Sequence, residues 1–164
     1  MTRTALLTTI ALSLVAGPAL ALSCLAPDVA RTYKQAAEAE ETYIVVYGQL
    51  SFDEGKLPIV DYNNQMDTPN NTLIPARVSG KSLTLDGFNT DFDKPITLNA
   101  KCFGPWCAKP ASGVPYLAFL ERTVDGYTLV LDPCGGYGFS RPSEAIREKA
   151  AACFQGGECT SEEY

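Results

Sequence analysis

The stretch Tyr43-Ile-Val-Val-Tyr-Gly-Gln-Leu-Ser-Phe52 decides the fold of this chain. Its β-branched and aromatic residues predict a long β-strand. Gly48 lies inside the run, and a glycine within a strand indicates a bulge or a sharp bend. A small barrel needs such a bend in order to curl. The run therefore predicts one strand of a strongly curved sheet.

The chain after this strand alternates between polar loops and short apolar runs. Residues 53–71 are polar and rich in turn residues, which predicts a loop. Asp125-Gly126 lies between two apolar runs and is a strong hairpin signal. We expect strands over residues 72–79, 81–85, 96–101, 113–122 and 127–131, and a second loop over residues 86–95.

Helical periodicity appears at both ends of this β-rich region. Pro27 opens the first helix, whose apolar stripe is Val29, Tyr33, Ala36 and Ala37. The second helix is expected from Pro142 to Phe154, before Gly156-Gly157. Two helices around five or six strands predict a mainly β fold with flanking helices. Within that class, we expect a small closed five-stranded barrel of the OB type, with an open α+β sandwich as the alternative.

The N-terminus has the pattern of a secretory signal peptide. Arg3 precedes an apolar run over residues 5–15, which is shorter than the ~20 residues that span a bilayer. Ala19-Leu20-Ala21 places small residues where a signal peptidase cleaves, so residues 1–21 are expected to be removed. Cleavage after Ser23 and lipidation of Cys24 stay open as alternatives. The mature protein is thus expected outside the cytoplasm, without a transmembrane segment.

Composition and charge fit one globular domain. Hydrophobic residues make up 46% of the chain and charged residues 20%, which is enough to bury a core. We expect a single domain over residues 22–159, a loose tail over residues 160–164 and a monomer. The formal charge of -6 argues against nucleic acid or an anionic membrane as a partner.

All six cysteines lie beyond the expected signal peptide, and an even number in an exported chain predicts disulfides. A Gly-Pro turn within residues 102–107 favours a bond between Cys102 and Cys107. Two glycines within residues 153–159 favour a bond between Cys153 and Cys159. Cys24 is then left with Cys134, although other connectivities stay open. A disulfide that closes a loop of this size contributes ~4–5 kcal/mol in the chain-entropy model.

The chain has no histidine, which removes the commonest general base and the commonest metal ligand. The segment from Cys102 to Cys107 contains the letters of a thioredoxin site, but four residues separate its cysteines, so a structural disulfide is expected. Asp91 and Asp93 form a carboxylate pair of the kind that ligates calcium, although such pairs are more often solvated. We therefore expect no catalytic residue, no metal and no cofactor.

Several motifs in order carry a family resemblance: Cys24-Leu-Ala-Pro27, the strand with Gly48, Lys101-Cys102, Gly113-Val-Pro-Tyr-Leu-Ala-Phe119 and Leu131-Asp-Pro-Cys-Gly-Gly136. This set resembles the netrin-like domain, which is the OB-fold module of tissue inhibitors of metalloproteinases. The resemblance covers the chain from Cys24 to about Cys134. It implies a five-stranded OB barrel with its N-terminal segment tied by disulfides to later strands.

The resemblance implies two roles. Many netrin-like domains are binding modules. In the inhibitors, the mature chain begins at a cysteine that caps the zinc of a protease, and the matching residue is Cys24. This chain departs from the inhibitors because their Cys-x-Cys start is absent.

We expect a non-enzymatic exported module that binds a protein or an envelope component. Metalloprotease inhibition through Cys24 and thiol-redox chemistry are the alternatives. Aromatic residues that could form a binding face are Tyr47, Tyr62, Trp106 and Tyr137. Trp106 and Tyr137 are the better candidates because they lie in Gly- and Pro-rich turns beside cysteines.

Overall fold

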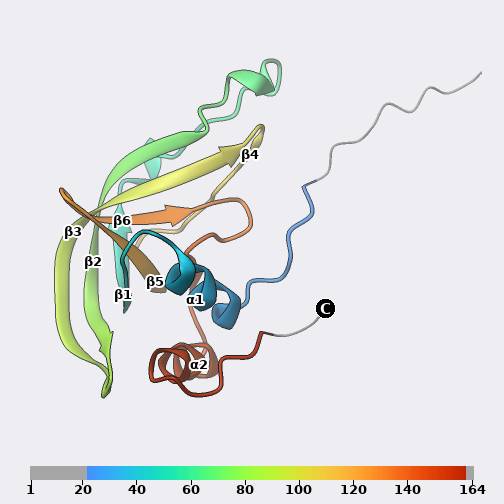
Figure 1. The fold of residues 1–164 in the computed structure, drawn as a ribbon. Coiled ribbons are helices and arrows are strands. Elements are labelled where there is room, and N and C mark those ends of the chain that lie inside the picture. The colour runs from blue at the N-terminus through green and yellow to red at the C-terminus, as the bar shows by residue number, and fades with distance from the viewer. Residues whose placement is uncertain (1–21, 162–164) are drawn as a thin grey trace, which may run out of the picture.

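The computed structural model describes residues 22–161, with two helices and seven strands (Figure 1). The expected signal peptide and residues 162–164 of the expected tail lie outside the described residues. The elements are α1 (Val29–Glu38), β1 (Tyr43–Phe52), β2 (Asn71–Thr84), β3 (Gly87–Phe103), β4 (Trp106–Cys107), β5 (Val114–Thr123), β6 (Gly126–Leu131), β7 (Gly138–Ser140) and α2 (Glu144–Phe154). Two short 3-10 helices, η1 (Glu54–Lys56) and η2 (Gln65–Asp67), lie between β1 and β2.

Five strands pair into a ring. β1 pairs with β2, β2 with β3, β5 with β6 and β1 with β5, all antiparallel, while β3 and β6 are parallel. β4 and β7 are short additions that pair with β3 and β5. The predicted mainly β class with two helices is confirmed, and the strand Tyr43–Phe52 has the predicted bounds.

Two clusters of buried side chains explain the apolar runs of β1 and β5. One cluster takes residues from all five ring strands, including Val46, Leu98 and Leu129. The other lies where α1 and α2 pack on the strands, and includes Val45 and Phe119. Because successive strand residues point to opposite faces, β1 and β5 bury residues on both sides. Figure 1 shows both helices on the same side of the ring.

The prediction of a loop over residues 86–95 was wrong, as was the break between strands 72–79 and 81–85. β2 and β3 are single long strands, joined by a tight turn before Gly87, whose φ is +97°. The outer face of this hairpin is open to solvent, so it needs no apolar residues to be a strand. Phe92 is buried on the inner face, while the neighbouring Asp91 and Asp93 are exposed.

Gly48 does not lie in a bulge. Its register with both β2 and β5 is continuous, and the irregularity in the β2–β3 ladder falls between Ser82 and Leu83. Gly48 instead permits a close approach of two backbones, since a β-carbon there would lie 2.6 Å from the carbonyl oxygen of Ser79. The glycine therefore marks strand crowding.

Side chains cap both helices at their N-termini. Asp28 Oδ1 accepts a hydrogen bond from the backbone N–H of Arg31 at 2.8 Å, and Ser143 Oγ accepts one from Ile146 at 3.3 Å. The second helix therefore begins at Glu144, two residues after the expected Pro142. The short strand β7 was not predicted. Within residues 22–161 no helix is both long and apolar enough to cross a membrane.

Three disulfides join all six cysteines in the pairs that the sequence favours: Cys24–Cys134, Cys102–Cys107 and Cys153–Cys159. The first ties the segment before α1 to the turn after β6. The second closes the short β3–β4 hairpin, and the third ties the end of α2 to the following segment. The first bond therefore holds the N-terminal segment to the ring, while the third holds the segment after α2 to that helix.

Candidate functional site

A surface hollow away from the helices lies at the end of the ring where the chain passes from β1 toward β2. It measures about 420 Å³ and is formed by residues 57–60 and 62 on one side and residues 105 and 107–109 on the other. We call it the loop groove. Its lining is mostly apolar, and the half-buried Leu57 packs on the ring core below. The groove therefore opens from the core to solvent.

Two large side chains of the groove face water. Ile59 is 87% exposed and Tyr62 is 74% exposed. Ile59 belongs to an apolar run, Leu57-Pro-Ile-Val60, within the loop that the sequence predicts as polar, and Tyr62 lies two residues after this run. Large apolar side chains that gather at a surface hollow are typical of interaction sites.

Hydrogen bonds anchor the first part of this loop to the segment before β5. Glu54 Oε1 accepts a hydrogen bond from the backbone N–H of Ser112 at 2.6 Å, and Ser112 Oγ accepts one from Phe52 at 2.9 Å. Asp53 Oδ1 accepts a further bond from Gly55 at 3.0 Å. The exposed part of the loop thus starts from a fixed base.

The opposite wall of the groove is the β3–β4 hairpin. Cys102 and Cys107 face each other in its register and are 1% and 9% exposed. Phe103 faces Trp106 one step further along, and Phe103 is 41% exposed. Since adjacent strand residues point to opposite faces, Trp106 points away from Cys107, which lines the groove. Trp106 is half-buried and lies beside the groove, on the outer face of the hairpin.

Tyr137, the other expected binding residue, lies elsewhere. Its ring stacks on Tyr43, with centroids 4.9 Å apart and planes 18° apart. Tyr137 also packs against both core clusters. Burial, together with a hydrogen bond to Tyr137, raises the pKa of Tyr43 well above its usual range. The structure thus places Trp106 beside the groove without lining it, and Tyr137 in a packed aromatic pair.

The two remaining aromatic candidates also separate. Tyr62 lines the loop groove. Tyr47 is half-buried, contacts the edge of Phe88, and has the Arg147 guanidinium 4.7 Å from its ring centroid. The side chain of Tyr47 therefore joins the sheet to α2 and does not contribute to a free face.

The expected alternative of a calcium site at Asp91 and Asp93 is not supported by their contacts. Asp93 forms a two-bond ion pair with Arg77, with distances of 2.7 and 2.6 Å, and Asp91 pairs with Lys81 at 2.6 Å. The hydrogen bonds from Arg77 lower the pKa of Asp93. Both carboxylates already have cations across the β2–β3 ladder, so they serve the hairpin.

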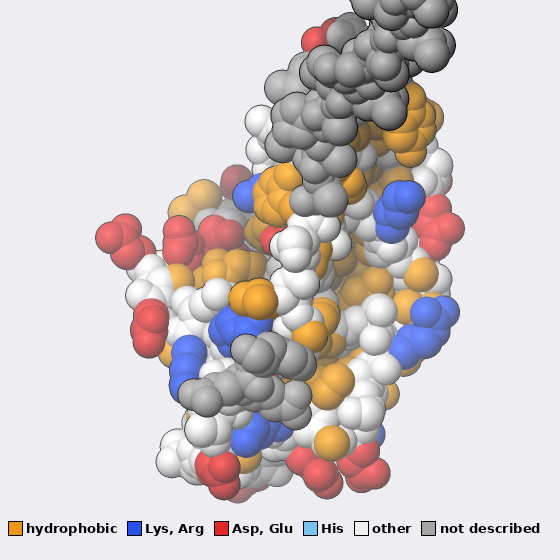
Figure 2. Space-filling model, turned by 90° about the vertical axis from the view of Figure 1, so that its right-hand side faces the viewer, with side chains coloured by type: hydrophobic (Ala, Val, Ile, Leu, Met, Phe, Trp, Pro, Cys, Tyr) orange, Lys and Arg blue, Asp and Glu red, His pale blue; other side chains and the backbone are white. Residues whose placement is uncertain are grey.

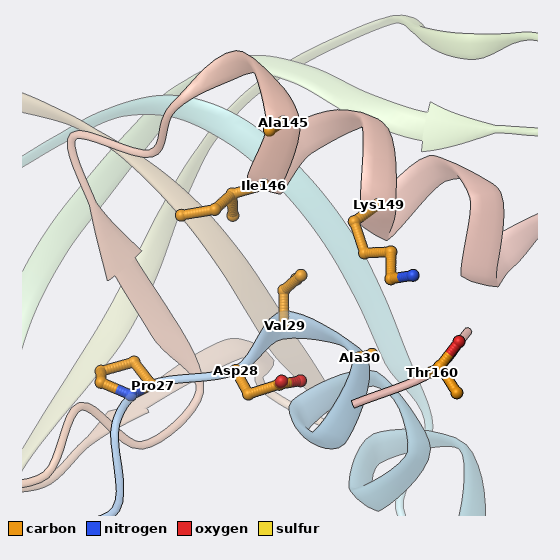
Figure 3. Close-up of a pocket in the computed structure, with 8 residues that line it drawn as sticks. All are labelled: Pro27, Asp28, Val29, Ala30, Ala145, Ile146, Lys149 and Thr160. Carbon is orange, nitrogen blue, oxygen red and sulfur yellow. The ribbon is translucent and has the colours of Figure 1, made fainter. Parts of the chain in front are cut away.

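A further hollow, of about 410 Å³, lies between the start of α1 and helix α2. Figure 3 shows Val29 and Ile146 lying on facing sides of it. Both side chains also pack in the cluster under the helices. Asp28, also at its rim, caps α1. These lining residues have structural roles, so the hollow reflects the packing of two helices.

The segment around Cys24 is exposed. Cys24 is bonded to Cys134, and the adjacent Leu25 is 67% exposed.

The face seen in Figure 2 carries hydrophobic side chains down its middle, with acidic side chains mainly toward its edges. The negative net charge of the chain is therefore not concentrated at the centre of this face.

Comparison of the chain with models of known protein families, with curated proteins and with solved structures gives no match. The interpretation of the site therefore depends on its geometry alone. Of the four aromatic candidates from the sequence, Tyr62 lines the groove, while Trp106 and Tyr137, the two preferred ones, do not; Ile59 and the apolar wall of the loop were missed. The available signal was the run Leu57-Pro-Ile-Val60 between polar segments.

Proposed function

We propose that this chain is an exported, non-enzymatic binding module that contacts a protein or another envelope component through the loop groove. The observation that carries the proposal is the exposure of Ile59 and Tyr62 at a hollow of mostly apolar lining. Exposed side chains of this size gain free energy when a partner removes them from water, at ~25 cal/mol per Å² of apolar area. The anchored base of the loop supports the same role because it limits the ordering cost of binding.

The connectivity supports an OB-type ring. Its strands follow the order β1-β2-β3-β6-β5 and return to β1, with β3 parallel to β6. In OB-folds, ligands are bound by the face of the second and third strands, by the loop between the first and second strands and by the loop between the fourth and fifth strands. The loop groove is built on the first of these two loops. The motifs that resemble the netrin-like domain agree with this proposal.

The disulfides support an extracytoplasmic location. Disulfides form and persist mainly in oxidising compartments, and all six cysteines of this chain are paired. The signal-peptide pattern of residues 1–21 points to the same location.

A second candidate function is metalloprotease inhibition through Cys24. It is favoured by the exposure of Cys24 and by its bond to Cys134, which holds the segment in place. Capping a zinc ion requires a free α-amine at Cys24. The intact mass of the protein from its native host tests this requirement: a chain that starts at Leu22 excludes the mechanism, and one that starts at Cys24 keeps it.

The thiol-redox alternative gains no support from the hairpin disulfide. A redox pair needs an accessible thiol with a lowered pKa, and Cys102 and Cys107 are almost fully buried. Their segment is a turn between two paired strands and contains no helix N-terminus of the kind that lowers a thiol pKa.

The main proposal is tested by substituting the groove. Ile59→Ser combined with Tyr62→Ser removes both exposed side chains, while Leu85→Ser is the matched control. Leu85 is 71% exposed and lies in the β2–β3 turn, at the far end of β2 from the groove. Quantitative capture from envelope extracts should lose a saturable partner with the double variant and keep it with the control. Equal capture by both variants would overturn the proposal.

A further inference from the structure

The wall of the loop groove that follows η1 is a short extended segment held at both of its ends. The backbone N–H of Leu57 donates a hydrogen bond to the carbonyl oxygen of Glu54 at 3.1 Å, and the carbonyl oxygen of Asp61 accepts one from Asn64 at 3.1 Å. Leu57 has a φ of −62° and a ψ of 149°, and residues 58–61 belong to no helix, strand or turn. The proline that follows Leu57 limits the segment further because its ring fixes φ. The segment is therefore restricted in conformation before anything binds to it.

The backbone in the middle of this segment is unpaired. Ile59 and Val60 donate no backbone hydrogen bond to the residues that the structure describes, and their carbonyl oxygens accept none from them. Both residues line the hollow of the groove. Unpaired N–H and C=O groups in an extended segment are a template on which another chain can pair. Such main-chain pairing gives affinity for an extended peptide, while hollows for alternate side chains give specificity.

The loop groove has one charged side chain among its lining residues, and it is that of Lys109. Lys109 is exposed and belongs to no ion pair found within residues 22–161. The chain as a whole has a formal charge of -6, so a cation without an acidic partner at this hollow is a local exception. A carboxylate on the partner would complement it. Because Lys109 is exposed, the peptide can continue past this carboxylate, as it does at an aspartate or glutamate side chain.

We propose that the loop groove binds an extended segment of a partner protein, with alternate apolar side chains in the hollow and an acidic side chain opposite Lys109. This inference rests on the binding role proposed above and adds the chemistry of the partner. The peptide backbone pairs with Ile59 and Val60, and every second side chain points into the hollow. Figure 1 shows the β1–β2 loop and β4, which form the two walls, at the same end of the molecule. A lipid tail could fill the hollow but could not pair with the backbone groups.

Selection from a displayed library of random linear peptides tests the proposal. The bait is the oxidised mature protein, and the peptides have about 12 residues, which span at most about 43 Å when extended. We expect enriched peptides in which apolar residues recur at every second position beside Asp or Glu. Their saturable binding should be lost when Ile59→Ser is combined with Tyr62→Ser. Enriched peptides that lack this pattern, or that bind the double variant equally well, would overturn the proposal.

Charge reversal at Lys109 tests the acidic contact. Lys109→Glu should weaken the binding of an enriched peptide roughly fivefold or more, because it replaces an attraction with a repulsion. Lys34→Glu is the matched control, since it makes the same charge change at an exposed position on α1. The control should bind the peptide as the wild type does. Equal weakening by both variants would show diffuse attraction between the peptide and the whole protein, and would overturn the contact at Lys109.

N-methylation of an enriched peptide tests the backbone pairing. Successive amides of an extended chain point to opposite sides, so methylating alternate amides removes the donors of one side at a time. Methylation of one alternate set should reduce the affinity roughly tenfold or more, and methylation of the other set should leave it unchanged. Equal affinities of the two methylated peptides would overturn pairing with Ile59 and Val60.

Two further results separate this inference from the proposed function. An envelope partner whose capture depends on Ile59 and Tyr62, together with an absence of enriched peptides, would keep the binding role and overturn the extended peptide. Groove-dependent binding of vesicles made of phosphatidylethanolamine and phosphatidylglycerol, without enriched peptides, would do the same. Capture that does not change in the double variant, with no enriched peptide, would overturn both.

Discussion

Gly48 and Gly80 lie directly opposite each other in the β1–β2 ladder, and neither position has room for a side chain. A β-carbon on Gly48 would lie 2.6 Å from the carbonyl oxygen of Ser79. A β-carbon on Gly80 would lie 2.2 Å from the carbonyl oxygen of Tyr47. Both contacts are with backbone atoms, which cannot move aside cheaply. The closed ring thus depends on two glycines from separate strands.

Gly48→Ala and Gly80→Ala should each destabilise the protein strongly. Overpacking of a rigid site costs ~1–3 kcal/mol, and the backbone contacts here favour the upper part of that range or more. Urea unfolding measures the loss. Ser51→Ala on the exposed face of the same strand is the control and should stay within about 0.5 kcal/mol of the wild type. Glycine variants as stable as that control would show that the two strands do not approach so closely.

The disulfides Cys24–Cys134 and Cys102–Cys107 should contribute unequally to stability. Cys24–Cys134 closes a separation of 110 residues, and Cys102–Cys107 closes one of 5. The chain-entropy model assigns about 4–5 kcal/mol to the first and about 2 kcal/mol to the second. Paired serine variants at each site, compared by urea unfolding, should keep this order. A larger loss at the short hairpin would mean that burial of Cys102 and Cys107 outweighs chain entropy.

Tyr43 should give the folded protein a dependence on alkaline pH. Its pKa is raised in the folded state, so its neutral form contributes stability fully below the ordinary tyrosine pKa of about 10. This contribution is lost as the pH rises from there toward the higher pKa of the folded state. Free energies of unfolding at pH 8 to 11 should fall less steeply for Tyr43→Phe than for the wild type. Identical slopes would contradict the packed pair with Tyr137.

Ser112 should control the order of the loop base. Its hydroxyl accepts the Phe52 N–H, and its own N–H donates to Glu54. Ser112→Ala removes the first bond and should cost ~1 kcal/mol. Hydrogen exchange of residues 53–57 should become faster, while the exchange of β3 stays unchanged. Faster exchange throughout the chain would instead indicate global destabilisation.

The sequence predicted the elements whose burial is regular. β1 has buried residues on both faces, and toward its end every second residue is buried. Its apolar content therefore marked the strand from Tyr43 to Phe52. The dipeptide Asp125-Gly126 marked the β5–β6 hairpin, and Gly126 has the positive φ that this turn needs. The disulfide pairs followed from local turn residues and from elimination.

The remaining features depend on contacts between distant residues. Asp91 and Asp93 lie in a strand although they are charged, because each pairs with a cation on β2. The local sequence does not show that pairing, so it predicted a loop. The apolar residues 57–60 line a hollow only because the hairpin around Pro105, which is distant in the sequence, lies opposite them. Tyr137 was in a turn, as predicted, but its partner Tyr43 lies 94 positions earlier in the chain. Local sequence therefore could not separate Tyr137 from Trp106 as a binding residue.

The most direct test of the binding role is site-specific photocrosslinking in the native host. A benzophenone side chain replaces Ile59 in one variant and Leu85 in another, and both positions are highly exposed. The account predicts a discrete crosslinked species from position 59 that is absent from position 85. It also predicts that Tyr62→Ser weakens this species. The same products from both positions, or none from position 59, would contradict a binding site at the loop groove.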